Sequence, residues 1–150
     1  MTKRNKIIYW VATGWLALGM VSTGIVQLVK MQEEVAKTVV HLGYPEYLLV
    51  VLGVWKILGV IAILIPGFPL IKEWAYAGFF FVMSGAIISH LVVSDQPAAF
   101  FGPTLLLILV AVSWYFRPAD RRLVLNLSPT KDNRLWKPDQ NYPKKERRNY

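Results

Sequence analysis

Four long runs of apolar residues, separated by short polar breaks, dominate the hydropathy pattern of the chain. They cover approximately residues 7–29, 47–65, 74–93 and 98–116. An α-helix needs about 20 apolar residues to cross the hydrocarbon core of a bilayer. A buried helix of a soluble domain would show a polar face, and these runs show almost none. The pattern therefore predicts an all-α membrane protein built as a four-transmembrane-helix bundle.

The polar break after the first run has a pattern of its own. Met31, Val35 and Val39 recur at helical spacing. The titratable residues of this break occupy the other faces: Glu33, Glu34, Lys37 and His41. Such a pattern is typical of a helix that lies in the membrane interface. We therefore expect a short interfacial amphipathic helix over residues 31–42, with its apolar side chains toward lipid or the bundle and a turn at residues 43–45.

The distribution of lysine and arginine predicts how the bundle is oriented. We call the side that holds the N-terminus the A side, and the opposite side the B side. Fourteen of the 17 basic residues fall on the A side, most of them in the C-terminal tail, whereas Lys30 and Lys37 fall on the B side and Lys56 lies within a run. Basic residues accumulate on the cytoplasmic side of membrane proteins. Both termini are therefore expected in the cytoplasm.

Composition divides the chain into two parts. Residues 1–117 are expected to form the transmembrane domain, and residues 118–150, rich in Pro, Asn, Lys and Arg, a basic and disordered cytoplasmic tail. The net charge of +8 lies mostly beside apolar segments, so an anionic membrane surface explains it and nucleic acid is not an expected partner. The absence of cysteine excludes disulfides, thiolate chemistry and cysteine-bound iron–sulfur clusters.

One stretch of the sequence carries specific motifs. The turn Pro66-Gly67-Phe68-Pro69 is followed by Lys72-Glu73-Trp74-Ala75-Tyr76-Ala77-Gly78 and then by Gly85-Ala86-Ile87-Ile88-Ser89-His90. With the turn at residues 43–45, this resembles the DoxX-like family of small bacterial membrane proteins, over roughly residues 5–117. The resemblance implies a four-span bundle in the bacterial cytoplasmic (inner) membrane. It also implies association with membrane quinone oxidoreductases in some relatives and scaffold roles in others, with no agreed catalytic residues.

Lys56 is the most unusual residue of the apolar runs, because it lies near the middle of the second one. A lysine at mid-membrane costs about 2.5–3.5 kcal/mol on insertion scales. Snorkelling is the alternative, but from this depth the side chain would hardly reach either interface. Gly53 and Gly59 beside it permit close helix approach. We therefore expect the ammonium to face the bundle interior and to bond a polar group on another helix.

Four further residues are candidates to share a ligand-binding pocket with Lys56. Gln27, Ser84 and His90 lie toward the B side, where the lysine leans, and could line a pocket open to the outside. In a simpler interpretation, Ser84 bonds its own backbone and the other two lie in the interface. Glu73 is the fourth candidate. An axial gap of about 9 Å allows it a direct salt bridge with Lys56 only if helices bend or water intervenes, and it could simply complement the dipole of its own helix.

Three classes of function remain. The sequence offers no catalytic or metal-binding constellation, which does not favour an enzyme. The first interpretation is an accessory or scaffold subunit of a membrane complex, redox or otherwise, that acts with a protein partner or as a homo-oligomer. The alternative is a protein that binds a quinone, a lipid or a small anion around Lys56, and no other cofactor is expected. A small transporter is the third, although the runs show no inverted repeat.

The predicted topology can be tested by labelling, because the chain contains no cysteine. Single cysteines in place of Lys37 or Asp95 should react with a membrane-impermeant maleimide added to intact cells. A cysteine in place of Thr130 should react only after lysis, because the tail is expected inside. The cysteine-free parent gives the background, and labelling of the tail from outside would contradict the orientation.

Overall fold

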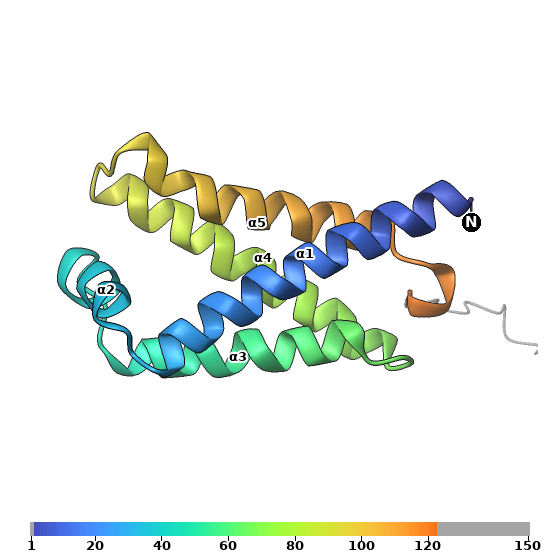
Figure 1. Cartoon of the computed structure of the whole chain (residues 1–150), viewed down its shortest axis with the longest axis horizontal. Coiled ribbons are helices and arrows are strands. Elements are labelled where there is room, and N and C mark those ends of the chain that lie inside the picture. Colours follow the sequence, from blue (N-terminus) through green and yellow to red (C-terminus); the bar gives the residue numbers. More distant parts are fainter. Residues whose placement is uncertain (1, 123–150) are drawn as a thin grey trace, which may run out of the picture.

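The computed structural model describes residues 2–122, which fold almost entirely into helices (Figure 1). Four helices are long and apolar enough to cross a membrane: α1 (Lys3–Leu28), α3 (Tyr47–Leu64), α4 (Pro69–Val92) and α5 (Pro97–Tyr115). The connection from α1 to α3 contains one α-helical turn, α2 (Gln32–Val35), and a π-helix, η1 (Ala36–His41); a 3₁₀ turn, η2 (Ala119–Arg121), follows α5. The described residues contain no strand. The prediction of an all-α chain with four spans is therefore confirmed.

Two helices begin earlier than the apolar runs. α1 extends into the basic N-terminal residues because Thr2 caps it, its hydroxyl accepting a hydrogen bond from the backbone N–H of Asn5 at 3.4 Å. α4 begins at Pro69 because the preceding turn is tight, with Gly67 (φ 76°) and Phe68 (φ 49°) both in the left-handed region. Apolar runs mark the part of a helix that can cross lipid, whereas caps and turns set its ends.

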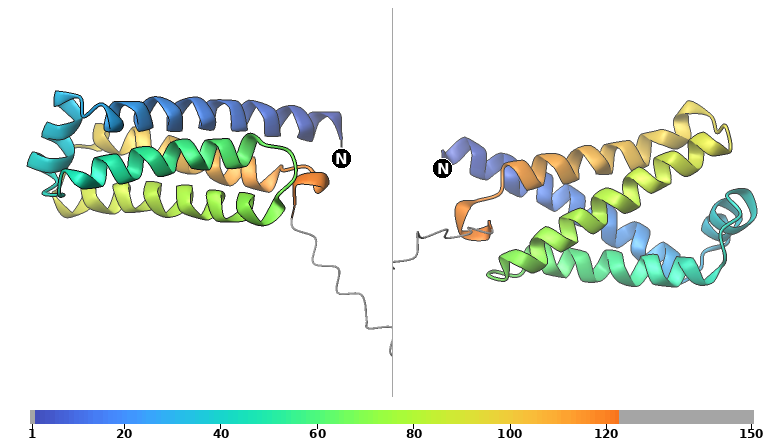
Figure 2. Two further views of the ribbon diagram at one scale, coloured as in Figure 1. Left: turned by 90° about the horizontal axis from the view of Figure 1, so that it is seen from below. Right: turned by 180° about the vertical axis from the view of Figure 1, so that it is seen from behind.

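α1 and α4 cross as an X, and α3 and α5 flank the crossing (Figure 1). Figure 2 (left) shows α1 along one face of the bundle, α4 along the opposite face, and α3 and α5 between them. α1 therefore lies beside α3 near the B side and beside α5 near the A side, and α4 does the reverse. The N-terminus and η2 lie together at the A side. Which face of the membrane this side meets stays a prediction.

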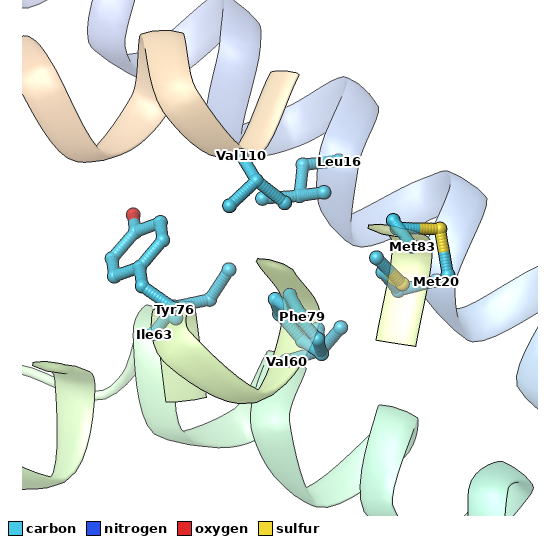
Figure 3. Packing of buried hydrophobic residues seen from close by; sticks show 8 residues of the cluster. All are labelled: Leu16, Met20, Val60, Ile63, Tyr76, Phe79, Met83 and Val110. Atoms are coloured by element: carbon cyan, nitrogen blue, oxygen red, sulfur yellow. The ribbon is translucent and has the colours of Figure 1, made fainter. Parts of the chain in front are cut away.

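The hydrophobic core lies where α1 and α4 cross (Figure 3). It consists of Leu16 and Met20 of α1, Val60 and Ile63 of α3, Tyr76, Phe79 and Met83 of α4, and Val110 of α5. A small set of hydroxyl groups lies beside it: Ser113 is hydrogen-bonded to Thr13 and to Tyr76, each at 2.7 Å. These bonds join α1, α4 and α5, and they matter because apolar contact alone is a weak reason for helices to associate in lipid.

α1 and α3 approach most closely at Gly24 and Gly53. A Cβ atom added to Gly53 would lie 2.8 Å from the backbone oxygen of Gly24 and 2.7 Å from Cγ of Leu28. The backbone oxygen cannot move aside without separating the helices, so this position requires a glycine. The face of α3 that continues from Gly53 also carries Lys56, which the close contact brings against α1.

The connection between α1 and α3 is helical, but polar residues contribute to the face that it turns toward the bundle. Thr38 is buried, and Glu34 and His41 contact other helices or turns, whereas Met31 is 48% exposed. The spacing of apolar residues did not predict that polar side chains face the bundle, because their hydrogen-bond partners lie on other segments of the chain. The two valines of the predicted apolar face are partly buried. The placement of this segment in the membrane interface stays a prediction.

η1 gives this connection an unusual backbone. A π-helix bonds each N–H to the carbonyl five residues earlier; it is rare, and it is frequently found at functional sites. The N–H of Leu42 bonds the carbonyl of Lys37 at 3.1 Å in this manner. η1 ends at His41, which reaches the turn between α4 and α5.

The C-terminal part of the chain is described only as far as residue 122. The sequence predicts that the transmembrane domain ends near residue 117 and that a disordered tail follows. Residues 118–122 turn back onto the bundle, where Arg121 donates a hydrogen bond to the carbonyl of Ile63 at 3.1 Å. The predicted tail beyond them, residues 123–150, lies outside the described residues.

Replacing Gly53 with alanine should destabilise the bundle. The added methyl group would force α1 and α3 apart, and overpacking of this kind costs about 1–3 kcal/mol. The melting temperature of the purified protein in detergent should therefore fall. Gly14→Ala is the control, because no heavy atom lies within 4 Å of a Cβ added there. Equal melting temperatures of the two variants would contradict the close contact.

Candidate functional site

Lys56 faces the bundle interior and contacts another helix, as the sequence suggested. It lies on the buried face of α3 with Gly53 and Val60, and it is only 5% exposed. Its Nζ donates a hydrogen bond to Oγ1 of Thr23 on α1 at 3.3 Å. The close approach of α1 and α3 makes this contact available.

Lys56 belongs to a cluster of polar side chains that we call the B-side cluster: Thr23, Gln27, Glu34, Thr38 and Lys56. Nε2 of Gln27 donates to Oε1 of Glu34 at 3.0 Å, and the hydroxyl of Thr38 donates to the same oxygen at 3.5 Å. Glu34 also attracts the Lys56 ammonium electrostatically. The cluster therefore joins α1, α3 and the α2–η1 connection around one buried positive group and one partly buried negative group.

An apolar groove reaches this cluster from the lipid side. It lies between α3 and α4, has a volume of about 270 Å³, and includes Lys56 in its lining. Gly59 and Gly78 leave room for it, and the exposed side chains of Trp55 and Trp74 stand at its edge. Lys56 is therefore a member of the B-side cluster and also lines a groove that opens toward the acyl chains of the bilayer.

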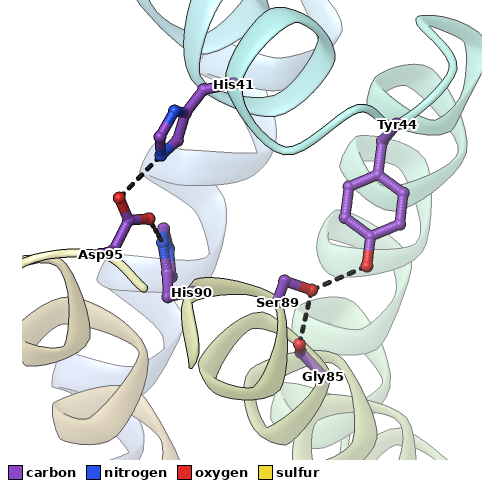
Figure 4. Close-up of polar contacts among 6 residues, drawn as sticks. All are labelled: His41, Tyr44, Gly85, Ser89, His90 and Asp95. Carbon is purple, nitrogen blue, oxygen red and sulfur yellow. Dashed lines mark hydrogen bonds and ion pairs between the residues drawn. The ribbon is translucent and has the colours of Figure 1, made fainter. Parts of the chain in front are cut away.

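Asp95 joins two histidines of different segments (Figure 4). Its Oδ1 lies 2.7 Å from Nε2 of His41, and its Oδ2 lies 2.6 Å from Nδ1 of His90. The hydrogen bond from His90, and after it the one from His41, holds the pKa of Asp95 below its usual value. The carboxylate is therefore ionised and accepts an N–H from each ring. This arrangement connects η1 to the end of α4.

A second contact connects the same parts of the chain (Figure 4). The hydroxyl of Ser89 donates to the carbonyl of its own helix at Gly85, at 2.8 Å. Its single proton is thereby used, so the 2.7 Å contact with Tyr44 has the tyrosine hydroxyl as donor. The tyrosine of the turn at residues 43–45 thus fastens the start of α3 to α4.

The structure brings only some of the five predicted site residues together. Lys56 and Gln27 share the B-side cluster, whereas His90 is buried near the end of α4 and has Asp95 as its partner. Ser84 bonds the carbonyls of its own helix at 2.8 and 3.2 Å, as in the simpler interpretation. Glu73 lies near the A side, where it accepts hydrogen bonds from Trp114 at 2.9 Å and from Arg117.

Sequence reasoning missed Glu34 and Thr38 as members of the cluster. Both were assigned to a surface helix, where polar residues normally face water. The signal was present in the spacing of Glu34, Thr38 and His41, which places three polar side chains on adjoining turns of one helix face. Only the position of Gln27 and Asp95 in the folded chain shows that this face points inward.

Lys72, the first residue of the motif that follows the turn at residues 66–69, is a second buried lysine. It is 0% exposed, and its Nζ donates to the carbonyls of Ala62 at 2.9 Å and Ile63 at 3.4 Å, and also to that of Ile65. Arg121 donates to the Ile63 carbonyl as well. The last carbonyls of a helix have no partner within it, so these two cations cap the end of α3.

Asp95→Asn should weaken the connection between η1 and α4 in a pH-dependent manner. A carboxylate whose pKa is lowered by folding stabilises the fold above its unfolded pKa, and this contribution is lost as the pH falls through the lower folded-state pKa. The variant should therefore melt below the parent at about pH 7, and the difference should shrink below the ordinary value of 3.8. Glu46→Gln is the control, because it removes an exposed partner of Lys30 on the same side. A difference that keeps its full size once the carboxylate is protonated would contradict the assignment.

Comparison with known proteins agrees with the motifs. The sequence matches the family model of the DoxX-like family over residues 11–113, which begins within α1 and ends within α5. No curated protein and no solved structure matches the chain. The matched region includes the B-side cluster, the Asp95 contacts, all of α3 and α4 and most of α1 and α5. The chain is therefore a multi-pass membrane protein that belongs to the DoxX-like family.

Proposed function

We propose that this DoxX-like protein binds a small amphiphile of the bilayer, a quinone or a lipid, with the polar end of the ligand at Lys56. In this proposal the protein acts in the bacterial cytoplasmic membrane with both termini inside the cell. The observation that carries it is the unused hydrogen-bonding capacity of two buried side chains of the B-side cluster, Lys56 and Gln27, of which Lys56 also lines a groove that opens to lipid.

Lys56 has N–H donors without an acceptor among the described residues. An ammonium group carries three N–H donors, and among the described residues Lys56 has one hydrogen bond, to Thr23. At 3.3 Å this bond is long, because N–H···O bonds are usually about 2.9–3.0 Å. The negative charge of Glu34 helps to offset the cost of burying the lysine. An acceptor on a ligand could therefore bind the ammonium without separating it from its countercharge.

Gln27 contributes an acceptor that lacks a donor. Its Oε1 is buried and has no hydrogen-bond partner among residues 2–122. An unmet buried acceptor costs about 1–3 kcal/mol. A ligand hydroxyl could accept from Lys56 and donate to Gln27 at the same time, whereas a carbonyl could satisfy only the lysine. Quinol hydroxyls and the free hydroxyls of lipid head groups fit both requirements, and a quinone carbonyl fits one.

The groove between α3 and α4 suits the apolar part of such a ligand. Its volume of about 270 Å³ lies just below the range of about 300–1,000 Å³ typical of small-molecule pockets. A ring or a short part of a chain would fit, and the remainder would stay in the surrounding lipid. The tryptophans at its edge, Trp55 and Trp74, offer flat surfaces for a ring.

An accessory subunit is the second candidate, and a different observation favours it. Gly14, Gly85 and Gly102 lie on helix surfaces where an added Cβ would meet nothing within 4 Å. Small residues on a lipid-facing surface allow another helix to approach closely. A partner protein or a second copy of the chain could therefore pack against α1, α4 or α5. Purification in a mild detergent separates the candidates, because a stoichiometric protein partner without a bound amphiphile would favour this one.

Lys56→Met tests ligand binding, because it keeps most of the side chain and removes the charge. Removing the lysine removes its own desolvation cost, and the countercharge that it leaves, Glu34, is only partly buried. The variant should therefore fold as well as the parent and lose the quinone or lipid that co-purifies with it, as measured by mass spectrometry of organic extracts. A double variant with Glu34→Gln avoids an orphaned carboxylate.

Lys30→Met is the matched control for this experiment. It removes a lysine from the same side of the bundle, where Lys30 is exposed and paired with Glu46. The control should retain the bound molecule. If Lys56→Met instead retains the molecule and melts at a lower temperature than the parent, the lysine serves only the structure and ligand binding at this site is refuted.

A further inference from the structure

Arg117, directly after α5, has unused hydrogen-bonding capacity near the A side. It is 3% exposed, and its Nη2 is paired with Glu73 while its guanidinium lies over the ring of Tyr76, 5.3 Å from the centroid. Its Nε and Nη1 are buried and have no hydrogen-bond partner among residues 2–122. Buried arginine nitrogens normally bond an acceptor, because an unmet donor keeps its full desolvation cost.

Other cations surround Arg117. Lys72 and Arg121 bond the end of α3, and Lys72 lies close enough to both arginines to be repelled by them. Arg122 donates from Nε to the carbonyl of Arg117 at 2.7 Å and from Nη2 to that of Tyr115 at 2.6 Å. Lys72, Arg121 and Arg122 thus donate to carbonyls, which neutralise no charge, whereas Arg117 is paired with the carboxylate of Glu73. The region therefore attracts a negatively charged ligand.

A cavity of about 650 Å³ lies against these arginines. Its lining includes Asn5, Glu73, Trp114, Arg117 and the exposed Arg122. A second cavity, of about 400 Å³, runs between α4 and α5 and is lined mainly by apolar side chains: Tyr76, Ala77, Phe80, Val110 and Ala111. Glu73 and Trp114 line both cavities, so the two adjoin. The hydrogen-bonded pair of Trp114 and Glu73 thus separates a chamber that contains charged side chains from an apolar groove along two helices.

We infer that this A-side site holds an anionic phospholipid, with its phosphate against Arg117 and Arg122 and an acyl chain in the groove between α4 and α5. Arginine donors match phosphate oxygens in charge and geometry. A free phosphate would use only the chamber that contains charged side chains. The groove favours a lipid, because Ala77 and Ala111 on its walls are exposed to the surrounding bilayer. The site involves neither Lys56 nor Gln27, so it stands apart from the proposed function.

Thermal shifts of the full-length protein in detergent test this inference. Phosphatidylglycerol should raise the melting temperature, whereas phosphatidylcholine and inorganic phosphate should raise it little. Arg122→Gln and Arg117→Gln should each weaken the apparent affinity for phosphatidylglycerol about tenfold, the effect of losing a charge-assisted hydrogen bond. Ala77→Phe should also weaken it by filling the groove. Arg4→Gln is the matched control, because it removes an exposed cation from the same side outside the cavity lining.

Three results would overturn the inference. Equal shifts with phosphatidylcholine would show that negative charge is not recognised. A full shift with inorganic phosphate, unchanged by Ala77→Phe, would assign the chamber to a free phosphate. An equal loss in Arg4→Gln and Arg122→Gln would show general attraction of anions rather than a site. Arg122→Gln and Ala77→Phe keep the test valid if Arg117→Gln does not fold, because both residues are exposed.

Discussion

The bilayer offers no water to polar groups, so each must find a partner within the protein or in a ligand. This constraint governs how the bundle is built. Crossed helices separate toward both ends, and the apolar core at the crossing cannot hold the ends together. Polar side chains do so instead, at the level where the helices diverge. Asp95 on the B side and Lys72 on the A side are two polar side chains that hold diverging helix ends in place.

The two ends use opposite chemistry. On the B side, the carboxylates of Glu34 and Asp95 accept hydrogen bonds from side chains of other segments. On the A side, Lys72 and Arg121 donate to backbone carbonyls at the end of α3. The charge of Glu34 is partly offset by the nearby Lys56 ammonium, whereas Lys72 and Arg121, which donate to carbonyls, have no such countercharge in these contacts. The A side therefore suits an anionic ligand, whereas the B side combines charges of both signs.

Energetic cost made some features of the molecule predictable from its sequence. The four spans follow from apolar length, and the inward orientation of Lys56 follows from the cost of a charge in lipid. The cost of burying a charge does not predict that Glu73 lies beside Arg117 or that Glu34 faces inward. Both placements depend on where helices cross and which loop ends meet, and sequence spacing along one helix carries no information on either. Ser84 illustrates the same limit, because its own backbone satisfies it.

The π-helix has a consequence for the tolerance of the chain to change. One residue on an α-helix turns the side-chain direction by about 100°, so a regular α-helix of the same length would aim His41 away from Asp95. The wider turn thus aligns two segments whose separation along the chain is 54 residues. Substitutions at the exposed positions of this connection leave that alignment intact, whereas removal of a single residue rotates everything beyond it. The fold therefore constrains the length of this connection more than its composition.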